Sequence, residues 1–295
     1  MYFKRDQWRV GLVDAPIEAV AAAGGLKRFP VHWLPSGPDL TFLADPFGLW
    51  RDGVLNLFAE LYDYRTRRGV IELLRFDGKF DLLDRRTVLS EPWHLSYPLV
   101  FEADGETWMT PEAHRSGALT LYRAAQFPDA WEPAARLKLD APAIDATPFR
   151  HEGRWWMAYS PAGDRLAKQS HLHFAHADHL LGPWTPHSGN PVQVDRSCSR
   201  PGGAAFLKDG VLTLPVQDCS RTYGGALRLL AIHELTPDRF RAEAGAALSL
   251  PRTAGAFRDG FHTLSACGGT TLIDVKRIDR SFTGLAADLR YAAGT

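Results

Sequence analysis

The chain has 295 residues, with 34 basic and 34 acidic side chains and a formal net charge of +0. This length exceeds the average domain, but all-β barrels and propellers reach it as one unit, so we expect one domain over residues 1–295. The balanced charge argues against a nucleic-acid partner and against an acidic disordered tail.

The cysteines and the N-terminus bear on the cellular compartment. Cys198, Cys219 and Cys267 follow no metal-like spacing, and so few cysteines suggest a reducing compartment without a disulfide framework. The start, MYFKRDQWRVGLVDAPI, has no apolar stretch of signal-peptide length, and no later segment reaches the length of a membrane span. Unless a targeting segment has been removed, we expect a cytoplasmic monomer or weak dimer without a transmembrane segment.

A repeat organises the chain after one short segment, APIEAVAAAGG, that is expected to be helical. Five segments share a polar start, an apolar run, a polar turn with glycine and a second apolar run. They read ADPFGLWRDGVLNLFAE, SYPLVFEADGETWMTPE, DATPFRHEGRWWMAYS, RPGGAAFLKDGVLTLPVQD and FHTLSACGGTTLIDV. Their turn glycines are Gly53, Gly105, Gly153, Gly210 and Gly268. Asp-Gly, Glu-Gly or Gly-Gly between apolar runs predicts a β-hairpin, because such turns need positive φ.

Further strand-like runs between the hairpins, such as VIELLRF, LTLYRAA, HLHFAHA and LRLLAIHEL, would complete four-stranded antiparallel sheets. A repeat of roughly 50 residues is the size of a propeller blade. We therefore expect an all-β, five-bladed β-propeller around a central channel. Its blade cores would lie near residues 41–63, 94–124, 143–176, 199–235 and 260–277. A β-sandwich with accidental periodicity is the alternative, and the five matched hairpins favour the propeller over it.

Polar residues flank the hairpins on the side away from the turns, where the blades of a propeller meet around its axis. Those expected before the first strand are Asp45, Ser96, Tyr97, Asp145, Arg200 and His262, and those after the second are Glu60, Glu112, Ser160, Gln217, Asp218 and Asp274. Buried ionisable groups are costly unless they are paired or used, so their convergence predicts a site. The alternative for each residue is a hydrogen-bond tie between blades.

Individual residues carry signals of different strength. Asp45 in LADPF and Asp145 in IDATPF repeat one pattern two blades apart, and paired carboxylates serve glycosyl chemistry. Glu112 in MTPEA either points inward or is an edge-strand glutamate. Arg200 in SRPGG either holds a phosphate or carboxylate, or neutralises the aspartates. His262 is either a ligand contact or an interior histidine.

The histidines of HLHFAHADH resemble a metal cluster, but they fall on an outer strand of the expected blade. Outer strands face solvent or a neighbouring blade rather than the axis. We therefore expect no metal site there, and no cofactor.

The motifs ADPF and IDATPF resemble the superfamily of arabinanases, levansucrases and invertases, five-bladed propellers that include glycoside hydrolase families 43 and 32. The stretches EPWHLSYPLVFE, SRPGGAAF, PVQDCSRTYGGALRLLAIHELT and GFHTL more closely resemble the propeller region of glucosamine inositolphosphorylceramide transferase family proteins and their stand-alone bacterial relatives. The resemblance implies that Asp45 is the base-like carboxylate and that Asp145 tunes a pKa. It also implies that the sugar-transfer domain of those transferases is a separate region, absent from this chain.

The sequence departs from the hydrolases where they place a general-acid glutamate, because it has Ser199-Arg200-Pro201-Gly202 there. Either Glu112 supplies the acid, or the leaving group is a phosphate or nucleotide that needs no proton and is stabilised by Arg200.

These observations predict a carbohydrate-active enzyme that cleaves or transfers a glycosyl unit on an anionic or phosphate-bearing glycan or glycolipid. The catalytic candidates are Asp45, Asp145 and Glu112, and the substrate-binding candidates are Arg200, His262, Gln217, Asp218, Tyr97, His94 and Glu60. A non-catalytic glycan-binding propeller and a protein-interaction propeller are the alternative functions. Carboxylates locked in salt bridges to Arg200 would favour binding or a structural role, and a broad apolar top face would favour protein interaction.

Overall fold

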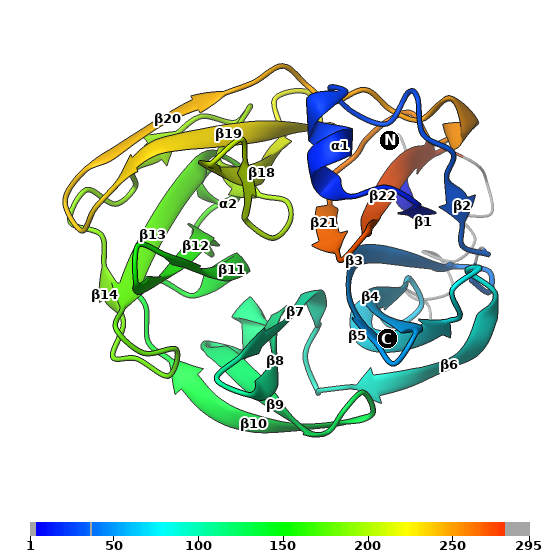
Figure 1. Cartoon of the computed structure of the whole chain (residues 1–295), viewed down its shortest axis with the longest axis horizontal. Helices are drawn as coiled ribbons and strands as arrows, with labels where there is room; N and C mark the ends of the chain where they lie inside the picture. The colour runs from blue at the N-terminus through cyan, green and yellow to red at the C-terminus, as the bar shows by residue number, and fades with distance from the viewer. Residues whose placement is uncertain (1–3, 36, 281–295) are drawn as a thin grey trace.

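A computed structural model of the protein describes residues 4–35 and 37–280. Five antiparallel sheets stand around one axis, each running from an inner strand to an outer one (Figure 1). The expected five-bladed β-propeller is confirmed. The prediction of one domain over 1–295 includes terminal residues that lie outside the described ranges.

Each blade has a path of four hydrogen-bonded strands. Blade I contains β3 (Thr41–Arg51), β4 (Val54–Asp63), β5 (Arg68–Phe76) and β6 (Leu82–Leu89), and blade II contains β7 (Ser96–Ala103), β8 (Glu106–Glu112), β9 (Leu119–Gln126) and β10 (Ala130–Leu137). Blade III contains β11 (Ala143–His151), β12 (Arg154–Pro161), β13 (His171–Ala177) and β14 (Thr185–Pro186), with the short β15 (Gln193–Val194) beside β13.

Blades IV and V depart from this regular succession. Blade IV has a broken inner strand, β16 (Arg200–Pro201) and β17 (Phe206–Lys208), followed by β18 (Val211–Asp218), β19 (Ala226–Leu235) and β20 (Phe240–Ala244). Blade V contains β21 (Leu264–Cys267), β22 (Thr270–Asp279), β1 (Arg5–Val13) and β2 (His32–Trp33). The short helices are α1 (Ile17–Ala22), as expected from the sequence, α2 (Ala167–Ser170), η1 (His114–Ser116) and η2 (Arg252–Ala254).

The hairpin turns have the backbone that their sequences predict. In blade I, Asp52 and Gly53 have φ values of 52° and 75°, and in blade II Asp104 and Gly105 have 53° and 80°. Two successive positive φ values match the two-residue turn that suits twisted strands. The same pairs occur at 152–153 and 209–210, and the turn of blade V has Gly268 at 57°.

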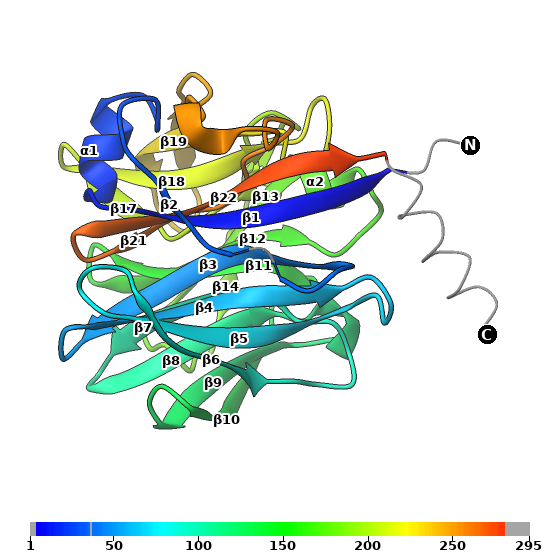
Figure 2. The ribbon, with the colours of Figure 1, turned by 90° about the vertical axis from the view of Figure 1, so that its right-hand side faces the viewer.

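Turns of neighbouring blades lie side by side. Trp50 Nε1 donates to Thr270 Oγ1 at 3.3 Å, which joins blades I and V, and Arg51 pairs with Glu102 of blade II. Glu152 and Gly210 line one surface pocket between blades III and IV. Figure 2 shows the β3–β4 and β21–β22 hairpins on one side of the molecule.

The hydrophobic core is divided among the gaps between adjacent blades. The cluster between blades II and III contains Trp108 and Trp155, and the cluster between blades III and IV contains Phe174 and Leu214. Three further clusters fill the other gaps. Each sheet therefore buries both faces, which explains strands that are apolar in runs rather than in alternation.

The ring closes by pairing strands from the two ends of the chain. Nine residues of β1 pair antiparallel with β22, from Arg5 opposite Asp279 to Val13 opposite Thr271 (Figure 2). Sequence reasoning found only the core of blade V, near 260–277, and missed that residues before 35 supply its outer strands. The turn pattern holds no information about a pairing over more than 250 residues.

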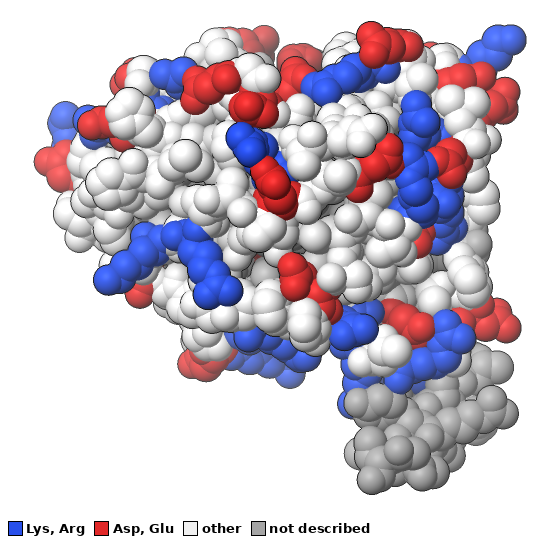
Figure 3. Space-filling view, turned by 90° about the horizontal axis from the view of Figure 1, so that it is seen from below, with Lys and Arg blue, Asp and Glu red and all other residues white. Residues whose placement is uncertain are grey.

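Charged side chains are interspersed on the face that Figure 3 shows, with no stripe of one sign across it. Among the ion pairs, Arg86 of β6 pairs with Asp84 on its own strand and with Asp129 of the neighbouring blade. Across the described residues, none of the helices has the length and apolar character that crossing a bilayer requires.

The closing ladder can be tested at Leu12, which is fully buried on β1 between blades V and I. Leu12→Ala should lower the free energy of unfolding by about 2–5 kcal/mol, because it removes buried methyl groups and leaves a cavity. Leu207→Ala is the control: Leu207 is 58% exposed on β17, so its change should stay within about 0.5 kcal/mol. Urea denaturation of both variants measures this, and equal small effects would contradict the role of the ladder.

Candidate functional site

Backbone bulges on the inner strands of three blades direct side chains toward the axis. Asp45, Tyr97 and Asp145 have φ values of 51°, 46° and 51°, and the strand register shifts at each of them. A bulge re-aims side chains, and aspartate tolerates positive φ better than most residues. Asp45 and Asp145 were expected before their strands, but they lie inside β3 and β11, because the ladder continues on both sides of the bulge.

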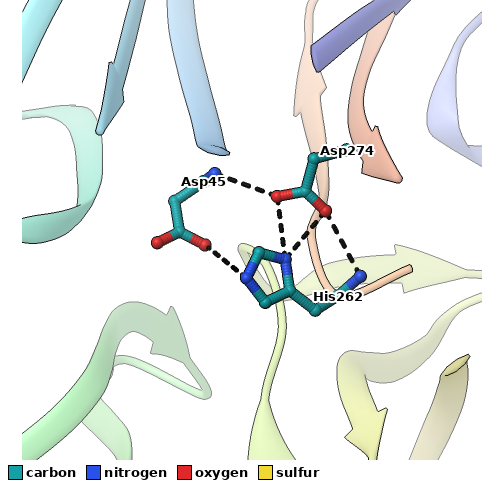
Figure 4. Close-up of side chains that lie close together, drawn as sticks. All are labelled: Asp45, His262 and Asp274. Atoms are coloured by element: carbon teal, nitrogen blue, oxygen red, sulfur yellow. Dashed lines mark hydrogen bonds and ion pairs between the residues drawn. The ribbon is translucent and has the colours of Figure 1, made fainter. Parts of the chain in front are cut away.

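Asp45, His262 and Asp274 form one compact group (Figure 4). Asp274, on β22, accepts hydrogen bonds from the backbone N–H groups of His262, Thr263 and Asp45 at 3.2, 3.0 and 2.9 Å. Its two oxygens each lie 2.8 Å from His262 Nδ1. The opposite ring nitrogen, Nε2, lies 3.4 Å from Asp45 Oδ1, which also accepts from Thr263 Oγ1 at 3.0 Å. Asp274 thus orients His262 toward Asp45.

Burial sets the protonation of this group. Desolvation raises the pKa of Asp45 to about 6, an effect that His262 opposes and that Asp274 reinforces. Burial alone would lower the pKa of His262, but Asp274 and Asp45 raise it above its ordinary value. Near neutral pH the pair therefore favours an ionised Asp45 beside a histidine that readily holds a proton.

Aromatic rings and a buried lysine fix His262 from the other side. Its ring stacks on Trp8 of β1 at 3.6 Å between centroids, and the Tyr223 ring packs against it in an edge arrangement at 5.4 Å between centroids. Lys276 is fully buried, lies 5.2 Å from the Trp8 ring centre and bonds to the Tyr223 carbonyl. The strand that closes the ring therefore also supports the site.

Asp145 is held by a different set of partners. Arg200 donates from Nε to Asp145 Oδ2 at 2.6 Å and from Nη2 to Oδ1 at 3.3 Å. Gln217 Nε2 adds a bond of 3.0 Å to Oδ2 and also donates to the Pro201 carbonyl at 2.8 Å. Burial raises the pKa of Asp145 and Arg200 opposes that effect. The effect of burial is the larger one, so the pKa of Asp145 lies above its ordinary value. Arg200 is thus a direct counter-charge of Asp145.

The glycines beside Arg200 serve packing between blades. A Cβ on Gly203, whose φ is 148°, would lie 1.8 Å from the Leu264 carbonyl oxygen of blade V. The Gly203 N–H donates to the Tyr97 hydroxyl at 2.8 Å. The close backbone approach that Gly203 permits therefore occurs with a neighbouring strand.

Glu112 and Glu60 occupy the same slot of blades II and I, each paired with the residue just before the bulge. Glu112 accepts from Ser96 Oγ at 3.1 Å and from the N–H and Nδ1 of His114 at 2.7 and 2.6 Å. Burial would raise the pKa of Glu112, but the bonds from His114 lower it overall. That direction does not suit the proton donor expected at Glu112.

Glu60 contacts His94, whose Nε2 lies 3.6 Å from Glu60 Oε1. The other ring nitrogen, Nδ1, accepts from the Gly69 N–H at 2.8 Å. Burial raises the pKa of Glu60 well above its ordinary value, and Asp45 and Glu112 are the largest further causes. Burial also lowers the pKa of His94, which favours its neutral form.

Two candidates lie away from this cluster. The Tyr97 ring is fully buried, and its hydroxyl bonds to Thr147 at 2.9 Å and to Gly203, so it crosses the axis from blade II to blades III and IV. Only its backbone N–H reaches Asp45, at 3.2 Å. Asp218 accepts hydrogen bonds from the hydroxyl and the N–H of Ser220 and pairs with Arg228 of β19 at 2.9 Å. Against the effect of burial, Ser220 and then Arg228 lower the pKa of Asp218.

The residues that converge are called the axial cluster below: Asp45, Glu60, Glu112, Asp145, Arg200, Gln217, His262 and Asp274. Sequence reasoning named all eight, but it gave Asp274 no role and missed Thr263, Tyr223 and Trp8. Thr263 follows His262 directly and, like His262, precedes the first strand of blade V, so the same position in the repeat could have identified it. Trp8 had no such signal, because it reaches the site only through the closing ladder.

Asp45, His262 and Asp274 are also a geometric candidate for a cation, since ligand atoms of all three lie within 4.8 Å of one another. Two carboxylates and an imidazole are donors that divalent metals accept. Here, however, Asp274 already accepts hydrogen bonds from three backbone N–H groups and contacts the His262 imidazole. Asp45 accepts a hydrogen bond from the Thr263 hydroxyl. The carboxylate oxygens of this group are therefore occupied by hydrogen-bond donors, with which a cation would have to compete.

Two solved structures of similar shape are glycoside hydrolases. The family 117 hydrolase Zg3597 of Zobellia galactanivorans matches with a TM-score of 0.55, 14% identity and coverage of 88% of this chain and 90% of that one. The catalytic domain of the family 62 α-L-arabinofuranosidase of Coprinopsis cinerea matches with a TM-score of 0.57, 9% identity and coverage of 82% and 93%. At such identities the likeness supports the fold alone.

Sequence relatives are more specific. Proteins named glucosamine inositolphosphorylceramide transferase 1 match from Arabidopsis thaliana, at 36% identity over 264 residues, and from Oryza sativa subsp. indica, at 35% over 256 residues. The alignments cover 88% and 79% of this chain but 34% of each relative, so the chain spans about a third of their length. Residues 34–255 match the family described as "Glucosamine inositolphosphorylceramide transferase 1, N-terminal". The chain belongs to this N-terminal domain family.

Proposed function

We propose that the chain is a carbohydrate-active enzyme that cleaves or transfers a glycosyl unit at the axial cluster. The observation that carries the proposal is the environment of Asp45, a buried carboxylate with a pKa of about 6 beside an oriented histidine. Glycosyl transfer needs one carboxyl group that accepts a proton or attacks carbon, and another group that assists departure. Buried carboxyls from several blades supply such a set.

In this proposal Asp45 is the base or nucleophile, because a pKa near 6 leaves it ionised yet basic at neutral pH. Asp145 supports it as a second carboxylate held by Arg200 and Gln217. His262 orients substrate beside Asp45. Glu112, kept ionised by His114, would accept hydrogen bonds from sugar hydroxyls.

We further propose that the substrate carries a phosphate or another anionic group. The names of the sequence relatives contain inositolphosphorylceramide, which is a phosphate-bearing lipid. Arg200 is the cation of the axial cluster, and arginine presents several donors to a phosphate. Its bonds to Asp145 leave Nη1 with only a long bond, 3.3 Å, to the Lys168 carbonyl.

A non-catalytic glycan-binding propeller is the second candidate function. The observation that favours it is the short Arg200–Asp145 ion pair, because a carboxylate locked in a salt bridge serves structure more readily than chemistry. A wild-type protein that binds glycosides but releases no aglycone from a panel of aryl glycosides would favour this function over catalysis.

The role of Asp45 as a base predicts that activity is lost at acidic pH, which gives an acid limb in the plot of kcat/KM against pH. With a base that must be ionised, kcat/KM should rise with pH and level off above about pH 6. Thr263→Val removes the hydroxyl that bonds to Asp45 and stabilises its ionised form. The limb should therefore move to higher pH by about one unit, the size of one hydrogen bond to a charged group.

Thr271→Val is the matched control for this measurement. Thr271 lies in the same blade, is fully buried, and donates to the Ala15 carbonyl at 2.7 Å. Its variant loses a comparable bond without touching Asp45, so its acid limb should stay in place. A limb that moves equally in both variants, or in neither, would contradict the assignment of Asp45.

The proposed role of Arg200 predicts that a phosphorylated glycoside and its neutral counterpart respond differently to the loss of this side chain. Arg200→Ala leaves Asp145 as a buried charge with less compensation, so stability should fall by about 3–5 kcal/mol. Titration calorimetry should therefore use the double variant Arg200→Ala with Asp145→Asn, and Asp145→Asn alone as its reference. If Arg200 recognises an anion, the double variant should lose about 2–5 kcal/mol more binding energy for a phosphorylated glycoside than for its neutral counterpart. Equal losses would leave Arg200 as a counter-charge only.

A further inference from the structure

Departure of a sugar or alcohol oxygen requires a proton donor, commonly a carboxylic acid, and few carboxyl groups of the axial cluster are suited to this role. Asp145 accepts hydrogen bonds from Arg200 and Gln217, and Asp274 accepts them from three backbone N–H groups, and such donors favour the ionised form of a carboxyl group. Asp45 is the proposed base. The remaining carboxyl groups of the cluster are Glu60 and Glu112, which occupy equivalent slots of neighbouring blades.

These two glutamates are equally buried, with 6% and 5% of their surface exposed, so burial does not distinguish them. Hydrogen-bond donors do. Glu112 accepts hydrogen bonds from Ser96 Oγ and from two groups of His114. Within residues 4–35 and 37–280 the Glu60 carboxylate accepts no hydrogen bond, and its ion-pair contact is His94 Nε2 at 3.6 Å. That distance is beyond a hydrogen bond of ordinary strength.

The local sequence explains the difference. Glu112 faces Ser96, but Glu60 faces Ala44, which has no hydroxyl. Strand β8 ends at Glu112, so the N–H of His114 is free to turn back to the carboxylate. Strand β4 continues to Asp63, and Tyr62 is committed to the ladder opposite Phe42. Blade I therefore builds the same glutamate slot without the donors that stabilise an anion.

The groups around Glu60 also disfavour its charge. Burial acts first, and then Asp45, Glu112, Asp274 and Asp145, each of them acidic. His94 supplies no fixed cation, because its Nδ1 accepts the Gly69 N–H and burial favours its neutral form. Tyr62 is a further titratable neighbour, and the positive charges that act on it are Arg67, Arg115 and Arg5. Arg115 also acts on His94. The pKa of Glu60 is accordingly raised well above its ordinary value.

We propose that Glu60 is the proton donor of this site, a catalytic role that rests on the function proposed above. In the step, the bond between the anomeric carbon and the leaving oxygen breaks, and that oxygen takes the proton of Glu60. A hydroxyl of water or of an acceptor forms the new bond to the anomeric carbon and gives its proton to Asp45. Glu60 ends as a carboxylate and Asp45 as a carboxylic acid, and exchange with solvent restores both.

The first test needs no substrate. Glu60 is protonated in the folded protein at pH values where it is ionised in the unfolded chain, so rising pH should destabilise the wild type relative to Glu60→Gln. Above the ordinary pKa of 4.5, the folding equilibrium constant should fall about tenfold per pH unit relative to the variant, up to the raised pKa. Urea denaturation from pH 5 to about 8 measures this relation.

Glu112→Gln is the matched control, because the pKa of Glu112 is shifted in the opposite direction from that of Glu60. The lowered pKa of Glu112 contributes stability that is fully present above 4.5 and is lost only as pH falls through the folded value. The difference between wild type and Glu112→Gln should therefore be constant from pH 5.5 to about 8. A constant difference for Glu60→Gln as well would overturn the proposal, because Glu60 would then be ionised in the folded state.

The second test uses leaving groups. Glu60→Gln should slow cleavage of an alkyl glycoside by about 10²–10⁴-fold, but that of the 2,4-dinitrophenyl glycoside by much less, because dinitrophenolate departs without a proton. Equal slowing of both would overturn the assignment. If the wild type cleaves neither glycoside while the pH dependence of stability is as expected, the proposed function and the catalytic role fail, and the protonated state of Glu60 stands.

Discussion

The antiparallel ladder between β1 and β22 is the constraint on which the site depends. It joins the two ends of the chain into blade V and so completes the ring. It also places Asp274 on β22 and Trp8 on β1 at the two sides of His262. Without that ladder Asp45 would have neither its histidine neighbour nor the carboxylate that orients it. The pairing that closes the fold therefore also positions residues of the site.

Burying several carboxylates around one axis is costly, and the protein offsets the cost unevenly. Asp145 has an arginine fork and an amide, Asp274 has backbone donors, and Glu112 has His114 and Ser96. Asp45 has weaker compensation, and Glu60 has the least. Carboxyl groups with different compensation have different pKa values, which is the usual way in which one site obtains both an acid and a base.

The same uneven compensation separates structural from chemical roles among the polar groups at the axis. Tyr97, Gly203 and Thr147 tie blades II, III and IV together across the axis, and the Tyr97 ring has no exposed surface. Asp218 and Arg228 tie two strands within blade IV. Polar residues at the axial ends of the blades thus include both groups that hold blades or strands together and groups available for chemistry. The hydrogen-bond partners of each residue determine which of these two roles it has.

The sequence by itself determined the blade architecture and the slots that face the axis. Asp-Gly and Glu-Gly turns require positive φ, so their recurrence located hairpins at Gly53, Gly105, Gly153 and Gly210 and, from them, Asp45, Glu60, Glu112 and Asp145. This worked because turn chemistry is local. Only the tertiary structure decided that residues 5–13 complete blade V, and that Arg200 neutralises Asp145. It also decided that Glu112 rather than Glu60 receives strong donors. Those outcomes depend on which strand ends meet around the axis, and no local pattern encodes the distances between them.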